Sequence, residues 1–151
     1  MALNIRDLEL TSLDLPGGGR FPDRFTAYFD NAVPRLSIRG VPSGAVELAL
    51  IMHDPDAPLP FGYSHWTCYG IPARAGLLGD DLPFRTGQND AGKREWFGPR
   101  PPVGHGKHHY YFWLYALDRS VSGEPSRAEF LAQYASHVIE QARLVATYSR
   151  G

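Results

Sequence analysis

Two long apolar runs most constrain how this chain can fold. "AVELALIM" (45–52) is nearly continuous in apolar residues, and "HHYYFWLYAL" (108–117) carries an aromatic ring at most positions. Side chains alternate between the two faces of a strand. One face of the second run therefore holds His108, Tyr110, Phe112 and Leu114, and the other holds His109, Tyr111, Trp113 and Tyr115. Both faces of the second run are apolar. The pattern therefore predicts buried strands, the second of them central and covered on both sides.

Turn residues divide the rest of the chain. Its 16 glycines and 13 prolines are spread along the sequence, and short apolar runs between such residues are typical of a β-sandwich or barrel. Further strands are predicted within "RFTAYF" (24–29), "PRLSIRGVPSG" (34–44) and "YSHWTCYGI" (63–71). Residues 72–107 are predicted to be mostly loop, and a connection of that length usually has a function.

The C-terminal part has the periodicity of a helix. Ser126 and Glu129 have the spacing of a capping box. One helical stripe then holds the apolar residues Phe130, Leu131, Tyr134, Val138, Ala142 and Val145. Residues 126–149 are therefore predicted to form one amphipathic helix on the sheet. The absence of repeats and linkers predicts a single domain over residues 1–151.

Composition narrows the class of protein. The chain has 43% apolar and 21% charged residues and a formal net charge of −1, which is typical of a globular protein and argues against a nucleic-acid surface. Cys68 stands alone, so no internal disulfide is expected and a reducing compartment fits. The sequence has no apolar stretch long enough for a membrane span, and residues 1–12 lack a leader pattern. A cytoplasmic location is expected.

Polar residues at three predicted strand ends are candidates for a site. Asp54 and Asp56 follow the first buried run, His65 begins another strand, and His108 with Tyr110 begins the longest one. If these ends meet, two imidazoles and a phenol can donate hydrogen bonds to one small anion. The carboxylates would then orient an imidazole and favour its charged form. The alternatives are an ordinary Asp turn and a structural histidine.

Three other histidines are given no role in the candidate site. His53, His105 and His109 are predicted to be solvated or edge residues, and Cys68 to be buried and inert. Arg100 lies in the proline-rich loop "GPRPPVG", which has few free backbone donors. A rigid, shaped turn is expected there.

Four ordered segments together resemble the phosphatidylethanolamine-binding protein family, which includes the Raf kinase inhibitor proteins, and its compact bacterial branch in particular. They are "PRLSIRGVPSGAVELALIMHDPDAP", "SHWTCYGIPA", "NDAGKREWFGPRPPVGHGKHHYYFWLYALD" and "HVIEQARLVATYSR". The resemblance implies an antiparallel β-sandwich with a C-terminal helical segment. It also implies an anion pocket at one end of the sandwich, lined by Asp54, Asp56, His65, Pro102, His108 and Tyr110, with Gly98, Pro99 and Arg100 at its rim.

The resemblance implies a non-enzymatic binding protein that needs no metal or other cofactor. Its ligand would be a phosphate-bearing molecule or headgroup such as phosphorylethanolamine, and a protein partner and a homodimer are both compatible with it. Two alternatives stay open: a metal-dependent hydrolase using His65, His108 and an aspartate, and a protease inhibitor. No "HExxH" or "GxSxG" motif supports hydrolysis.

Overall fold

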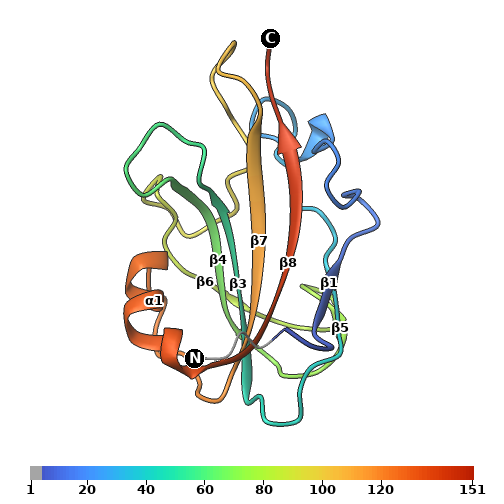
Figure 1. The fold of residues 1–151 in the computed structure, drawn as a ribbon, viewed down its shortest axis with the longest axis vertical. Coiled ribbons are helices and arrows are strands. Elements are labelled where there is room, and N and C mark those ends of the chain that lie inside the picture. The colour runs from blue at the N-terminus through green and yellow to red at the C-terminus, as the bar shows by residue number, and fades with distance from the viewer. Residues whose placement is uncertain (1–4) are drawn as a thin grey trace.

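The computed structural model describes residues 5–151 and contains two antiparallel β-sheets (Figure 1). The smaller sheet has the order β1 (Glu9–Thr11), β2 (Ser37–Arg39), β5 (Gly76–Leu77). The larger has the order β6 (Arg85–Thr86), β4 (Tyr63–Ile71), β3 (Glu47–Asp54), β7 (His108–Leu117), β8 (Val138–Tyr148). The predicted mostly β, antiparallel sandwich is therefore confirmed. Residues 1–4, part of the stretch predicted to lack a leader, lie outside the described residues.

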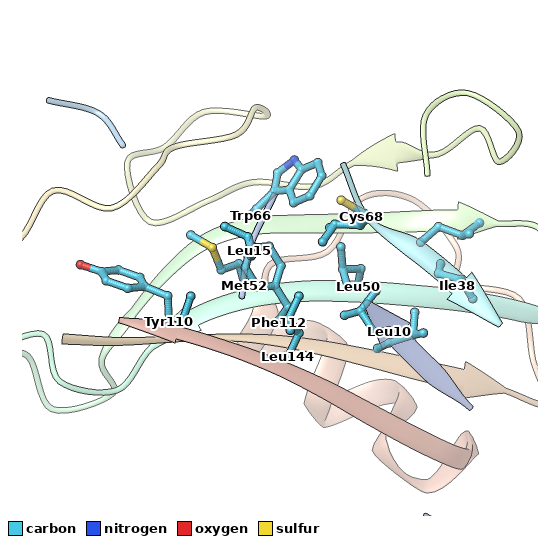
Figure 2. Close-up of a cluster of buried hydrophobic side chains, with 14 of the residues drawn as sticks. Leu10, Leu15, Ile38, Leu50, Met52, Trp66, Cys68, Tyr110, Phe112 and Leu144 are labelled. Atoms are coloured by element: carbon cyan, nitrogen blue, oxygen red, sulfur yellow. The ribbon is translucent and has the colours of Figure 1, made fainter. Parts of the chain in front are cut away.

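The main core lies between the two sheets (Figure 2). The strand period of two points alternate residues of the larger sheet at β1 and β2. This inner face buries Leu50, Phe112 and Leu144 against Leu10 and Ile38. In Figure 2 the ring of Tyr110 lies at one end of this cluster, so the core leads directly to the strand ends where polar residues gather.

A helix covers only part of the opposite, outer face of the larger sheet. Helix α1 (Arg127–Tyr134) begins at a Ser126–Glu129 capping box, and its Phe130 ring stacks on Tyr69 with centroids 5.4 Å apart. The outer face of β7 is consequently buried at Tyr115 but only half-buried at Trp113. The expectation that this strand is covered along both sides holds only next to α1.

The predicted helix over 126–149 is wrong beyond Tyr134. The chain passes through the short 3-10 helix η2 (Ala135–His137) and then forms β8, which pairs along the whole of β7. The burial of β8 follows a period of two, and Leu144, Ala146 and Tyr148 all lie inward. Apolar residues at 138, 142 and 145 fit a helical stripe by coincidence, while the β-branched residues of the segment favour a strand.

Residues 24–29 do not form the predicted strand, because the 3-10 helix η1 (Asp23–Phe25) is followed by turns. Residues 72–107 are mostly loop, as predicted, and contain the two-residue strands β5 and β6. Within the described residues, no helix is both long and apolar enough to cross a membrane.

Candidate functional site

A β-bulge sets the direction of His65. Where β3 pairs with β4, His53 lies opposite Ser64 rather than His65, so His65 is an extra residue on its strand. Regular alternation would have placed His65 on the outer face beside His53. Instead its ring lies 5.4 Å from that of Tyr110, edge to face, on the inner face.

The bulge opens onto a cavity at the end of the core. Its volume is about 310 Å³, and it is bounded by the β3–β4 connection, the proline-rich loop before β7 and the inner residues of β4 and β7. The lining residues are Asp54, Ala57, Pro58, Leu59, Tyr63, His65, Phe97, Arg100, Pro101, Pro102, His108 and Tyr110. The structure thus brings together the three strand ends that the sequence singled out.

Asp54 and His108 form a buried pair at the cavity wall. The Nδ1–H of His108 donates to Oδ2 of Asp54 over 2.7 Å, and both side chains are only 3% exposed. Burial raises the pKa of Asp54, against the lowering effect of the His108 hydrogen bond. Asp54 also accepts from the backbone N–H of Asp56 at Oδ1. The carboxylate therefore fixes the ring of His108 and turns its Nε2 away from the protein interior.

The Nε2 of His108 is engaged by a second imidazole. Nδ1 of His105 lies 2.7 Å from it, so Asp54, His108 and His105 form a hydrogen-bonded chain. His105 is exposed and lies between Gly104 and Gly106, which have φ values of +75° and +87°. The prediction that His105 is a solvated residue is correct in its exposure, but the residue also contacts a candidate site histidine.

His65 is a neutral side chain enclosed by aromatic rings. Its Nδ1–H donates to the carbonyl of Phe97 over 2.7 Å, and the rings of Tyr63, Phe97 and Tyr110 lie around it. Burial lowers the pKa of His65 to about 4. With Nδ1 carrying the proton, Nε2 is an acceptor at neutral pH. The expectation that His65 donates a hydrogen bond to the anion is therefore not met, because its N–H points to the Phe97 carbonyl.

Tyr110 and Arg100 supply donor chemistry. Burial raises the pKa of Tyr110, so its hydroxyl keeps its proton and can donate into the cavity. Arg100 is exposed at the mouth, where its guanidinium lies 5.8 Å from the ring centroid of Tyr28. Pro102 is an exposed wall residue. Arg100 thus adds positive charge beside the opening.

Three predicted residues are not in the cavity lining. Asp56 is half-exposed, and its Oδ2 accepts from the backbone N–H of His109 and contacts that residue's Nδ1 at 2.8 Å. Gly98 and Pro99 are buried behind the wall. The N–H of Gly98 donates to Asn31, and a Cβ at this position would lie 2.3 Å from the Phe25 carbonyl. These residues position the lining loop without facing the cavity.

Sequence reasoning missed the aromatic walls and the loop anchor. Tyr63 and Phe97 flank His65, and their aromatic character next to a predicted site residue was the available signal. Asn31 holds the proline-rich loop from outside, accepting from Gly98 N–H at 2.7 Å. Its φ of +53° is unusual for a residue with a side chain. Nothing in the sequence links it to residue 98.

His53 is the clearest misassignment among the histidines. It was predicted to be solvated, yet it is 6% exposed and lies on the outer face of β3. Its Nδ1 is hydrogen-bonded to Ser64 Oγ at 3.0 Å. Burial, followed by the charge of Arg127, lowers the pKa of His53 to about 4. The β3–β4 connection explains the error, because it lies against the ring of His53, and a Cβ at Gly62 would be 2.7 Å from its Nε2.

The three ligands of the hydrolase alternative are not assembled. Across residues 5–151, no three His, Cys, Asp or Glu side chains are grouped closely enough to hold a metal ion.

Cys68, predicted to be buried and inert, is buried, and its burial raises the pKa of its thiol.

Comparisons with known proteins agree with this architecture. The family model described as phosphatidylethanolamine-binding protein matches residues 11–149. A UPF0098 protein of Methanothermobacter thermautotrophicus is 39% identical over 143 residues, covering 88% of this chain and 93% of that protein. A Mycobacterium tuberculosis relative, LppC, whose name marks it as a candidate lipoprotein, is 37% identical and covers 93% of this chain and 72% of its own length.

A solved structure extends the agreement to three dimensions. The crystal structure of Escherichia coli YbcL, described as a member of the mammalian PEBP family, has a TM-score of 0.87 and 29% identity, with 97% of this chain and 100% of that chain covered. The family match spans nearly the whole chain. This chain belongs to the phosphatidylethanolamine-binding protein family.

Proposed function

We propose that the cavity binds the phosphate group of a small ligand such as phosphorylethanolamine and that the protein acts by binding, without catalysis. The observation that carries this proposal is the buried Asp54–His108 pair at the cavity wall. With Nδ1 held by the carboxylate, the ring of His108 can present an N–H at Nε2 to an oxyanion that displaces His105 from this nitrogen, and such an N–H is a directed, charge-assisted donor.

The donors available to the ligand lie on one side of the cavity. The His108 ring and the Tyr110 hydroxyl project from the same face of β7, and Arg100 stands at the mouth. His65, held neutral, can accept a hydrogen bond from a protonated phosphate oxygen or from the ammonium of phosphorylethanolamine. Net affinity in the micromolar range or weaker is expected, because charge-assisted bonds of about 1.5–3 kcal/mol are offset by desolvation and ordering.

The commonest nucleophilic side chains are not found in the wall of this cavity. Among the described residues, no serine, threonine, cysteine or lysine lines this cavity. Regulation of a protein partner and a cytoplasmic location remain predictions from the family resemblance and from composition. The lipoprotein name of the LppC relative is a reason to test location directly by fractionation.

Calorimetric titration with phosphorylethanolamine in chelator tests the proposal. Wild type should bind saturably, and ethanolamine, which lacks the phosphate, should not bind. His108→Gln should weaken binding at least tenfold, and Tyr110→Phe, which keeps the ring, should weaken it about fivefold by loss of one hydrogen bond. His137→Gln is the matched control, because His137 also pairs with an aspartate, Asp118, outside the cavity.

The outcomes separate the possibilities. Equal affinity in wild type and His108→Gln would refute the role of the Asp54–His108 pair, provided circular dichroism shows both proteins folded. Binding that appears only after zinc is added would favour a metal-dependent activity instead.

A further inference from the structure

A second cavity lies on the outer face of the larger sheet, where α1 leaves it uncovered. Its volume is about 550 Å³, and it is bounded by the β3–β4 connection, the outer residues of β7 and β8 and the start of α1. We call it the outer groove; its lining residues are His53, Pro55, Pro60, Phe61, Gly62, Tyr111, Trp113, Arg127 and Arg143. The connection between β3 and β4 separates it from the cavity described above.

Among the described residues, two cationic side chains and no carboxylate line the outer groove. Neither Arg127 nor Arg143 lies within 4.0 Å of an acidic oxygen anywhere in residues 5–151. Asp90 lines a neighbouring cavity together with Arg127. Its Oδ2 accepts a hydrogen bond from the backbone N–H of Ser64 and not from Arg127. His53 is neutral, since burial lowers its pKa to about 4. The groove is therefore electropositive and rich in donors.

The charge of Arg127 is poorly compensated by the protein. Within residues 5–151, its Nε is buried and has no hydrogen-bond partner, which is costly for a charged group. An anion in the groove that Arg127 and Arg143 both line would stabilise this charge by attraction, without contacting the buried Nε itself.

The rest of the lining is apolar and aromatic. The Tyr111 and Trp113 rings stand parallel along β7, 5.9 Å apart, and the Arg143 guanidinium lies 5.8 Å from both centroids. Phe61 projects at the edge of the groove and is 87% exposed. A free inorganic anion would leave this surface uncovered, whereas cavities of this size accommodate an organic ligand. Partly exposed aromatic surface beside cations that lack a carboxylate partner fits a ligand with an aromatic ring and an anionic group.

We propose that the outer groove is a second binding site, which takes an aromatic oxyanion. The phosphate or carboxylate of the ligand would lie between Arg127 and Arg143, and its ring would pack against Trp113 and Phe61. This site is separate from the phosphate cavity and uses none of its lining residues.

Nuclear magnetic resonance titration with phenyl phosphate tests the proposal. Of the three tryptophan indoles, only Trp113 lies in the groove, whereas Trp66 and Trp96 are buried in the core. The indole N–H signal of Trp113 is assigned by its absence from the spectrum of Trp113→Phe. This signal should shift saturably as phenyl phosphate is added. Arg127→Gln and Arg143→Gln should each weaken that titration about tenfold, and Arg119→Gln, an exposed arginine outside the groove, should leave it unchanged. Benzoate in place of phenyl phosphate distinguishes a carboxylate from a phosphate preference.

Two results would overturn the proposal. The first is a Trp113 signal that stays still, or that titrates equally in wild type and in both groove variants. The second is loss of the Trp113 response in His108→Gln, which would assign the whole effect to the other cavity. Inorganic phosphate should bind at least tenfold more weakly than phenyl phosphate, as judged from the Trp113 titration. Equal affinities would refute the proposal that the groove binds the aromatic ring of the ligand.

Discussion

The neutral state of His65 makes protein stability depend on pH. Burial lowers the pKa of this imidazole from 6.5 to about 4, and its side chain is nearly inaccessible. The folded state therefore binds a proton less readily than the unfolded state, so stability is full above pH 6.5 and falls as the pH drops toward 4. A shift of this size corresponds to about 3 kcal/mol between pH 7 and pH 4, of which about 2 kcal/mol is lost by pH 5.

The variant His65→Gln isolates this contribution. A glutamine amide can still donate to the Phe97 carbonyl that accepts from Nδ1 of His65, but it does not titrate. Urea unfolding at pH 7, 6 and 5 should show wild type losing about 2 kcal/mol more than the variant over this range. A side-chain titration of His65 should show no protonation above pH 5. Parallel dependence of stability on pH in the two proteins would show that His65 does not have a lowered pKa in the folded state.

Three further predictions concern single contacts. Asp54→Asn should weaken phosphorylethanolamine binding about tenfold in calorimetry, because a neutral amide is a weaker acceptor for the Nδ1–H of His108 and holds its ring less firmly; unchanged affinity would contradict this. His105→Ala should increase the affinity for phosphorylethanolamine about fivefold, since the ligand no longer has to break the hydrogen bond between His105 and Nε2 of His108. Weaker binding would instead show that His105 contacts the ligand. Glu140→Ala should lower the free energy of unfolding, measured in urea, by about 2–3 kcal/mol, because the carboxylate accepts hydrogen bonds from the backbone N–H groups of Asp7 and Leu8. A loss below about 0.5 kcal/mol would show that these bonds contribute little.

Much of the larger sheet could be predicted from local pattern. The bounds of β4 and β7 agree with the predicted runs 63–71 and 108–117, because both are rich in β-favouring residues and end at turn signals. Strand β3 continues two residues further than predicted, to Asp54, where Pro55 ends the ladder. That extension places the carboxylate of Asp54 on the inner face, within reach of His108.

The parts that could not be predicted depend on pairing between distant segments. The segment of β8 was predicted as a helix because its apolar spacing fits both periods, and its pairing with β7 decides for the strand that its β-branched residues also favour. The bulge at His65 leaves no local signal, yet it decides that His65 faces the cavity and Ser64 faces His53. The same limit applies to charge, since the sequence allowed a protonated His65, and only its burial among aromatic rings shows that it stays neutral.

A histidine side-chain NMR titration with phosphorylethanolamine in chelator tests most directly whether the Asp54-held ring of His108 receives an oxyanion. We expect saturable shifts of the His108 ring signals with loss of the His105 contact, while His65 stays neutral. His108 signals that do not change at saturating ligand, in a protein shown to be folded, would contradict it.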